Sequence, residues 1–201
     1  MITILDYGAG NLRSVQNTLG EIGAGYELVR DSAGLARATK IILPGVGHFG
    51  QMMRALDQMQ VREALLDRIR AGVPFLGICL GLQALFESSE EAPDECGLGL
   101  VAGRIKKFSG EMRVPHMGWN EIEPCDGAAT SPLLRDLPAM AHVYFAHSYY
   151  APVGPSTSAA CEYGGIRFSA AIEQNNLFAI QFHPEKSGAI GQALLRNFAD
   201  L

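Results

Sequence analysis

Apolar residues recur along the chain with two different periods, and each period predicts a different kind of element. Short apolar runs of the length of buried strands cover residues 2–5, 26–29, 40–43 and 73–78. Apolar residues at intervals of three and four, as on one face of a helix, cover residues 12–22, 52–59 and 61–69. Strands that alternate with helices in this way are typical of a parallel sheet covered by helices.

The pattern changes after residue 97, where helical spacing fades until about residue 155. Runs with the composition of strands then lie at residues 98–101, 119–122, 142–146, 159–162, 168–173 and 177–182, and a final amphipathic helix covers residues 190–198. Tyr163-Gly164-Gly165 suits a hairpin turn between two of these strands. We expect a single domain, residues 1–201, of the α/β class, with a mostly parallel central sheet, flanking helices and added antiparallel strands.

A cysteine lies in segment 75–83, at the point where the strand pattern becomes a helix pattern. Glycine stands two residues before and two residues after Cys79, which is the layout of the G-x-S-x-G nucleophile elbow with cysteine as the nucleophile. Helical spacing continues to Phe86, so the helix N-terminus would favour a thiolate and the Leu80 N–H would face a developing oxyanion. The alternative is a buried cysteine that packs as a small hydrophobe beside turn glycines.

Two other segments rich in glycine follow predicted strands. Residues 44–50 bring bare backbone to the carboxyl edge of the sheet, where open α/β sheets bind ligands. The N–H groups of Gly45, Val46 and Gly47 can therefore supply a second donor to an oxyanion hole, unless the segment is a plain connection. Residues 6–11 lack the full G-x-G-x-x-G pattern of a phosphate loop, so we expect a tight turn, capped by its final Asn, or a loop beside the active site.

His183-Pro184-Glu185 follows the apolar run 177–182. In an extended chain residues i and i+2 point to the same side, and Pro184 biases His183 toward extended geometry. Glu185 is thus placed to accept a hydrogen bond from the imidazole, which leaves the other ring nitrogen for a thiol. If the two strands are parallel neighbours, Cys79 lies at the same sheet edge and completes a triad. The alternative is a capped histidine at a strand end.

Two further features have both a structural and a functional interpretation. The acidic segment 88–95 suits a solvated loop, or a lip that meets the ammonium group of a substrate. Trp119, the only tryptophan, would mark a partner surface if it is exposed and would belong to the core if it is buried.

Composition excludes several classes of protein. The chain is 48% hydrophobic and 18% charged with a net charge of −5, which argues against disorder and against nucleic-acid binding. The N-terminus lacks the features of a signal peptide, and no apolar run reaches the length of a membrane span. The spacing of the four cysteines and five histidines matches no metal pattern, so we expect a cytoplasmic protein with reduced thiols and no metal.

Three motifs together resemble the class I glutamine amidotransferases: residues 44–47, 77–83 and 182–185. They carry a Cys-His-Glu triad in that chain order. A narrower match, to the glutaminases of histidine biosynthesis, rests on residues 6–11, 44–49, 115–120 and 145–149. The resemblance spans essentially the whole chain and implies the three-layer fold of this family.

The resemblance also implies a mechanism. Cys79 attacks the side-chain amide of L-glutamine, His183 oriented by Glu185 moves the protons, and water hydrolyses the thioester to glutamate. The residues that would bind the amino-acid end of glutamine are Gln83, Glu91, Ser148 and Tyr149. Their ordinary alternatives are helix surface, loop acid and polar strand residues.

A partner is implied as well, because ammonia released into water would be protonated. The family docks on a cyclase subunit with a (β/α)₈ barrel, as a heterodimer, which makes imidazole glycerol phosphate and aminoimidazole carboxamide ribotide. We expect this cyclase to be a separate polypeptide and expect no cofactor. Candidates for the interface are Trp119, Asn120 and Lys186, an aromatic anchor with polar neighbours.

Three other functions remain open at this point. The chain could serve another class I amidotransferase, such as anthranilate or aminodeoxychorismate synthase, which would use ammonia in a different reaction. It could be a cysteine peptidase on the same scaffold, or a regulatory subunit without catalysis. Glutaminase assays with each partner distinguish these alternatives.

Overall fold

The structure is a computed structural model that describes residues 1–8, 12–125 and 131–201. Residues 9–11 of the predicted glycine-rich turn, with the Asn11 cap, lie outside the described residues. The described helices are α1 (Leu12–Glu21), α2 (Ser32–Ala36), α3 (Phe49–Gln58), α4 (Arg62–Arg70), α5 (Leu80–Gln83) and α6 (Gly188–Asp200), with a 3₁₀ turn η2 (Pro184–Lys186). None of these helices is long and apolar enough to cross a bilayer.

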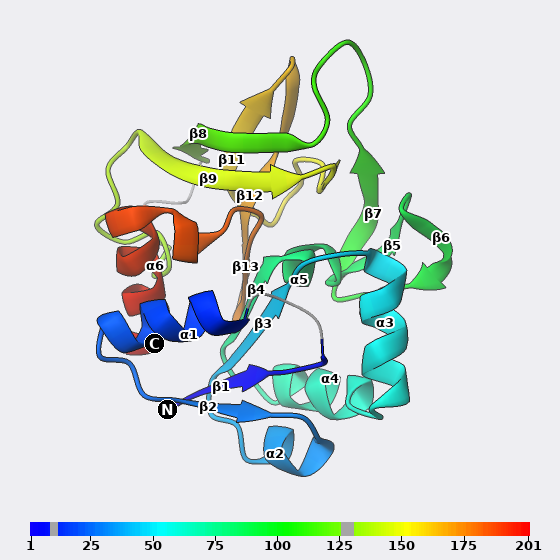
Figure 1. Ribbon diagram of the computed structural model, residues 1–201, viewed down its shortest axis with the longest axis vertical. Coiled ribbons are helices and arrows are strands. Elements are labelled where there is room, and N and C mark those ends of the chain that lie inside the picture. Colours follow the sequence, from blue (N-terminus) through cyan, green and yellow to red (C-terminus); the bar gives the residue numbers. More distant parts are fainter. Residues whose placement is uncertain (9–11, 126–130) are drawn as a thin grey trace.

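Nine of the described strands form one sheet, in the order β2-β1-β3-β4-β13-β12-β11-β8-β9. Their bounds are β1 (Ile2–Leu5), β2 (Tyr26–Val29), β3 (Ile41–Gly45), β4 (Phe75–Cys79), β8 (His116–Pro124), β9 (Ala141–His147), β11 (Thr157–Tyr163), β12 (Ile166–Gln174) and β13 (Leu177–Ile180). Strands β2, β1, β3, β4 and β13 run parallel, and each later strand is antiparallel to its neighbour. This arrangement confirms the predicted class, a parallel core with added antiparallel strands (Figure 1).

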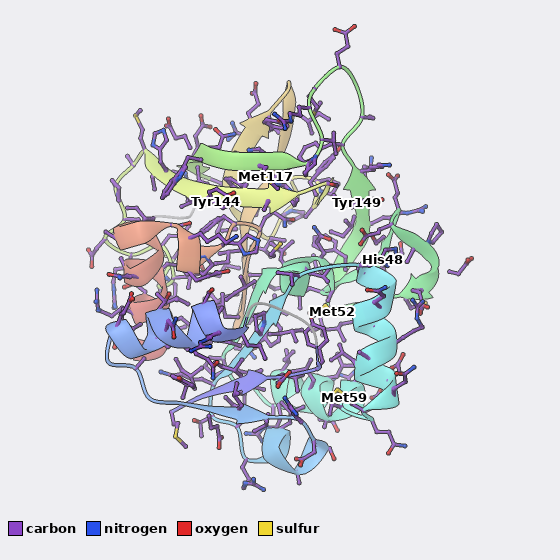
Figure 2. The ribbon with its side chains drawn as sticks, viewed as in Figure 1. His48, Met52, Met59, Met117, Tyr144 and Tyr149 are labelled. Atoms are coloured by element: carbon purple, nitrogen blue, oxygen red, sulfur yellow. The ribbon has the colours of Figure 1, made fainter. Side chains whose placement is uncertain are left out.

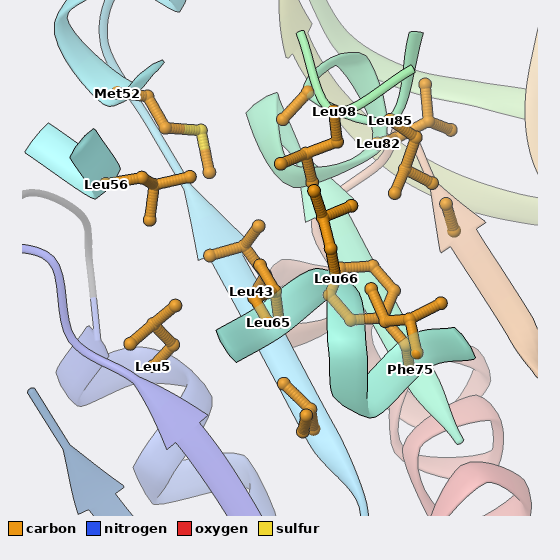
Figure 3. Close-up of a cluster of buried hydrophobic side chains, with 14 of the residues drawn as sticks. Leu5, Leu43, Met52, Leu56, Leu65, Leu66, Phe75, Leu82, Leu85 and Leu98 are labelled. Carbon is orange, nitrogen blue, oxygen red and sulfur yellow. The ribbon is translucent and has the colours of Figure 1, made fainter. Parts of the chain in front are cut away.

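Helices cover both faces of the parallel strands because successive strand residues point to opposite faces. Leu5 and Leu43 belong to a core on one face, beneath α3 and α4 (Figure 3). Their neighbours Ile4 and Ile42 belong to a second core on the other face, against α1 and α6. The parallel part therefore has three layers, helices on a sheet on helices (Figure 1).

A second sheet has the order β10-β7-β5-β6, with bounds β10 (Tyr149–Tyr150), β7 (Val101–Lys107), β5 (Phe86–Ser89) and β6 (Ala92–Cys96). The prediction that helical structure continues to Phe86 was wrong, because α5 ends at Gln83 and Phe86 opens β5. Phe86 pairs with Val101 of β7, and the Leu85 carbonyl accepts the Val101 N–H. These partners are distant in the sequence, so local spacing could not reveal them.

The carboxyl ends of three neighbouring strands meet at one edge of the large sheet. Strand β4 lies between β3 and β13, and all three run parallel. Ile78 pairs with Ile180, so the residues that follow these two strands emerge side by side. The predicted juxtaposition of Cys79 with the segment after residue 180 is thus confirmed.

Candidate active site

Cys79 is the last residue of β4 and directly precedes α5. Its backbone angles, φ +55° and ψ −106°, lie in a region that side chains rarely adopt. A Cβ added to Gly77 would lie 2.6 Å from the Gly81 carbonyl oxygen, and one added to Gly81 would lie 2.0 Å from that of Leu43. The sharp turn of a nucleophile elbow is present, and its close packing requires both glycines.

The surroundings of the Cys79 sulfur differ from those predicted. Helix α5 has only four residues, so its N-terminus carries little of the dipole that we expected to favour a thiolate. Instead, the Nε2 group of Gln181 lies 3.6 Å from Cys79 Sγ as a hydrogen-bond donor, and Gln181 is fully buried. Gln181 was not identified from the sequence, although an amide inside the apolar run 177–182 is the signal that could have found it.

His183 and Glu185 are in contact, with Nδ1 of the imidazole 2.9 Å from Oε1 of the carboxylate. Their side chains are 5% and 3% exposed. Burial lowers the pKa of His183, but hydrogen bonds to Cys79 and Glu185, with the charges of both, outweigh burial and raise this pKa to about 10. The site therefore favours an imidazolium held between the Glu185 carboxylate and the Cys79 sulfur.

The contact between His183 and Glu185 arises from a turn, whereas we predicted an extended chain. His183 itself is extended, but η2 begins at the next residue. The His183 N–H donates to the Tyr144 carbonyl (2.9 Å), and the Ser187 hydroxyl donates to the His183 carbonyl (2.6 Å) and accepts from the Tyr144 N–H (3.0 Å). Strand β9 thus holds the histidine in place from outside the parallel core.

A pocket of about 300 Å³ opens over the cysteine and the histidine. The predicted oxyanion residues Val46, Gly47 and Leu80 line it. As the first residue of α5, Leu80 has an N–H without an acceptor inside the helix. Gly45 instead pairs with Cys79 in the β3–β4 ladder, where a Cβ would lie 2.7 Å from that of Leu80. Gly45 therefore provides space for the elbow, whereas Val46 and Gly47 line the pocket.

The four predicted substrate-binding residues line the same pocket: Gln83, Glu91, Ser148 and Tyr149. The Nε2 group of Gln83 donates to the Tyr149 carbonyl (2.9 Å) and to Oε1 of Gln181 (3.1 Å), which leaves its own carbonyl oxygen for a ligand. Glu91 lies in the turn between β5 and β6, so the acidic segment is a hairpin and not the predicted loop. One Glu91 oxygen accepts the Phe49 N–H (2.6 Å), and the other can meet a cation.

Strand alternation separates the predicted interface residues. Trp119 is 57% exposed on the outer face of β8, opposite Tyr144 of β9, and Lys186 Nζ lies 5.3 Å from the Tyr144 ring centroid. Met117, 65% exposed, shares this face, and Figure 2 shows it beside Tyr144 on the adjacent strands. Asn120 points to the inner face, where its amide donates to the Glu162 carbonyl (2.9 Å). We call Met117, Trp119, Tyr144 and Lys186 the outer patch.

Several pocket residues were not identified from the sequence: Pro115, Met117, Ala146 and His147. All four lie within the motifs 115–120 and 145–149, but only the pairing of β8 with β9 brings them to the pocket. Among the described residues, no group of three or more His, Cys, Asp or Glu side chains is placed to hold a metal ion. The chemistry of the pocket is thus that of a buried thiol, an imidazole and a carboxylate.

Comparison with known proteins identifies relatives of this chain. The chain matches the family Glutamine amidotransferase class-I over residues 3–201. It is 48% identical to imidazole glycerol phosphate synthase subunit HisH of Deinococcus radiodurans, over 98% of this chain and 92% of that protein. It is also 48% identical to the HisH subunit of Thermosynechococcus vestitus, over 100% of this chain and 96% of that protein.

Solved structures share the fold at low identity. A crystal structure of glutamine amidotransferase superposes with a TM-score of 0.76 at 19% identity, over 100% of this chain and 99% of that one. The structure of PurLQS from Thermotoga maritima gives a TM-score of 0.72 at 19% identity, over 99% of this chain and 97% of that one. At these identities the likeness concerns the fold alone.

Proposed function

The chain belongs to the class I glutamine amidotransferases and, within them, to the HisH subunits of imidazole glycerol phosphate synthase, and we therefore propose that Cys79, His183 and Glu185 are its catalytic triad. It is accordingly a glutaminase of histidine biosynthesis. The observation that carries the proposal is the 2.9 Å contact between His183 and Glu185 beside the pocket that contains Cys79.

In the proposed reaction, the Cys79 thiolate attacks the side-chain amide carbon of L-glutamine. The C–N bond breaks as the His183 imidazolium gives a proton to the leaving nitrogen, and ammonia departs. Neutral His183 then takes a proton from water, whose oxygen attacks the thioester and releases glutamate and the thiolate. Glu185 stabilises the imidazolium that recurs in this cycle, which agrees with its buried contact to Nδ1.

Each tetrahedral intermediate carries an oxyanion that needs donors. The Leu80 N–H and the backbone of Val46 and Gly47 line the pocket beside the sulfur and are the donors that we propose. The contribution of Gly45 is to let β3 approach the elbow closely enough for these groups to converge.

Hydrogen-bond polarity supports an orientation for glutamine in the pocket. The Gln83 carbonyl oxygen and the available Glu91 oxygen are acceptors, so they suit the α-ammonium group. Ser148 and Tyr149 lie across the same pocket and can donate to the α-carboxylate. The four residues would thereby select an α-amino acid over a simple amide.

Released ammonia would pass to a cyclase subunit with a (β/α)₈ barrel, with which this chain would form a heterodimer. The cyclase would use it to form imidazole glycerol phosphate and aminoimidazole carboxamide ribotide. The outer patch supports this docking, because Met117, which lines the pocket with Lys186, and Trp119 on the same face of β8 both expose apolar surface.

The test uses the complex with its cyclase. Cys79→Ala should lower glutamine-dependent product formation by at least about 1,000-fold, whereas product formation from added ammonium should stay unchanged. Cys96→Ala, at an exposed thiol, is the matched control and should retain both activities. Retention of glutamine use by Cys79→Ala would overturn the triad, and stimulation of ammonia release only by a chorismate-using synthase would overturn the choice of partner.

A further inference from the structure

Gln181 has no role in the triad, yet its side chain is fully buried against the nucleophile. Its two amide atoms bridge Gln83 and Cys79: Oε1 accepts from Gln83 Nε2 (3.1 Å), and Nε2 donates to Cys79 Sγ (3.6 Å). An amide costs free energy to bury unless both of its ends are bonded. The position of Gln181 therefore depends on the direction in which the Gln83 amide points.

One backbone carbonyl determines that direction. The Tyr149 carbonyl oxygen can only accept, so the Gln83 atom 2.9 Å away from it must be Nε2. The same Nε2 then requires an acceptor from Gln181, which is Oε1, and this leaves Nε2 of Gln181 as the atom that faces Cys79. The donor toward the sulfur is thus a consequence of the Tyr149 carbonyl.

A pair of buried histidines holds the same carbonyl from the other side. His147 Nδ1 lies 2.8 Å from the Tyr149 carbonyl oxygen and must donate to it. In a neutral imidazole Nε2 then accepts, and His116 Nδ1 lies 3.1 Å from it as the donor. The Asn120 amide lies 3.4 Å from His116 Nε2 and completes the chain as its last donor.

Both histidines are held in the neutral state that this order of donors requires. Burial lowers the pKa of His116 to about 4 and that of His147 to about 3. The His116 ring also stacks between Tyr163 and Phe145, with centroid distances of 4.0 Å and 4.8 Å. Packing therefore determines the orientation of the His116 ring, and the hydrogen bonds determine the tautomers of both histidines.

We propose that Gln181 is a further catalytic residue, which donates a hydrogen bond to the Cys79 thiolate, and that His116 and His147 are positioning residues that orient it through the Tyr149 carbonyl and Gln83. The chain of hydrogen bonds runs from β8 and β9 to the elbow and takes the place of the helix dipole that a longer α5 would supply. This inference deepens the glutaminase function proposed above and rests on it.

The first experiment measures how fast iodoacetamide alkylates Cys79 as a function of pH, with the Cys79 peptide followed by mass spectrometry. Gln181→Met keeps the length of the side chain and removes the donor, so the midpoint of the pH profile should rise by about one unit. Gln192→Met, on the surface of α6, is the matched control and should not change the profile. An unchanged midpoint in folded Gln181→Met would overturn the role of Gln181.

The second experiment tests the histidines. His116→Phe keeps an aromatic ring between Tyr163 and Phe145 but removes the donor to His147, and it should lower the alkylation rate of Cys79 by about threefold to tenfold. His116→Asn replaces the donor at the Nδ1 position and loses the ring, so it should recover most of that rate. If His116 acts only through its packing, Cys79 should be alkylated more slowly in His116→Asn than in His116→Phe. That order of rates would overturn the proposal.

Glutamine kinetics of the complex separate this inference from the function on which it rests. Gln181→Met should lower kcat by about tenfold with little change in the KM for glutamine, because the donor acts on the sulfur. Alkylation needs neither glutamine nor cyclase. Absence of glutaminase activity in the wild-type complex would therefore refute the proposed function. If the wild type is active but neither Gln181→Met nor His116→Phe changes the alkylation of Cys79, only the hydrogen-bonded chain is refuted.

Discussion

Cys79, the proposed nucleophile, occupies a strained backbone conformation. A non-glycine residue in such a region costs on the order of 1–3 kcal/mol. The strain is held by the parallel ladder on both sides of β4, since β3 pairs with Cys79 itself and β13 pairs up to Ile78. At the residue scale, pairing with the two neighbouring strands therefore holds the Cys79 backbone in its strained conformation.

This strain makes a prediction about two inactive variants. Replacement of alanine by glycine ordinarily destabilises a protein, but at φ +55° glycine is unstrained. Cys79→Gly should therefore unfold with a free energy about 1 kcal/mol higher than that of Cys79→Ala. Urea denaturation of the two variants measures the difference, and a Gly variant less stable than the Ala variant would show that the elbow is not strained.

His183 provides a second prediction at this scale, because its pKa in the folded protein is raised to about 10 from an ordinary 6.5. A raised pKa contributes stability that is fully present below pH 6.5 and is lost as the pH rises through about 10. The advantage of wild type over His183→Gln, on the order of a few kcal/mol, should thus shrink across this window. Denaturant midpoints at several pH values test it, and an advantage that stays constant between pH 6 and pH 10 would contradict it.

At the scale of elements, the short helix α5 is the feature that differs most from expectation. Its four residues lie between β4 and β5, and glycines let it pack directly on β3. After β13, the turn η2 reverses the chain so that Glu185 contacts the His183 ring. Two short elements thus bring the three residues of the proposed triad together, and β9 anchors the second of these elements.

Close packing of the elbow predicts a large effect of a single methyl group. Gly81→Ala places a Cβ 2.0 Å from the Leu43 carbonyl oxygen, so it should destabilise the protein by about 3 kcal/mol or more. Gly20→Ala, in α1 with open space around it, should instead stabilise by about 0.5–1 kcal/mol. Thermal unfolding of both variants checks the contrast, and equal effects would mean that the turn can relax.

At the scale of the whole molecule, the antiparallel strands extend the sheet beyond the active site and carry Met117, Trp119 and Tyr144 of the outer patch on one face. The inner face of the same strands carries the histidine chain that ends at Gln181 and Cys79. Strands β8 and β9 therefore serve two purposes, one on each face, which follows from the twofold period of strand residues.

The outer patch predicts which surface residues the proposed cyclase partner contacts. Trp119→Ala should weaken association with the cyclase by about 2 kcal/mol, roughly 30-fold, because buried aromatic anchors dominate such interfaces. Met140→Ala, at an exposed apolar residue that precedes β9, is the control and should leave the affinity unchanged. Calorimetric titration measures both, and unaltered binding of Trp119→Ala would place the interface elsewhere.

Most elements were predictable from local spacing, because burial of one face imposes the same period wherever an element forms. Strands β1 and β2, helix α6 and the hairpin at Gly164-Gly165 agree with their patterns. The end of α5 was not predictable, since Leu82, Leu85 and Phe86 have helical spacing while Phe86 is bound by a strand from another part of the chain. Periodicity reports burial, not the partner that buries a residue.

The sequence by itself determined the reactive groups and the glycines that let them approach, because these depend on residue type at short spacing. It also placed Cys79 and His183 at one sheet edge, since parallel strands share their carboxyl ends. Only the tertiary structure decided that Asn120 turns inward while Trp119 faces solvent, and that Gln181 reaches the sulfur. Those outcomes depend on strand pairing and hydrogen-bond polarity between residues far apart in the chain, which no local pattern encodes.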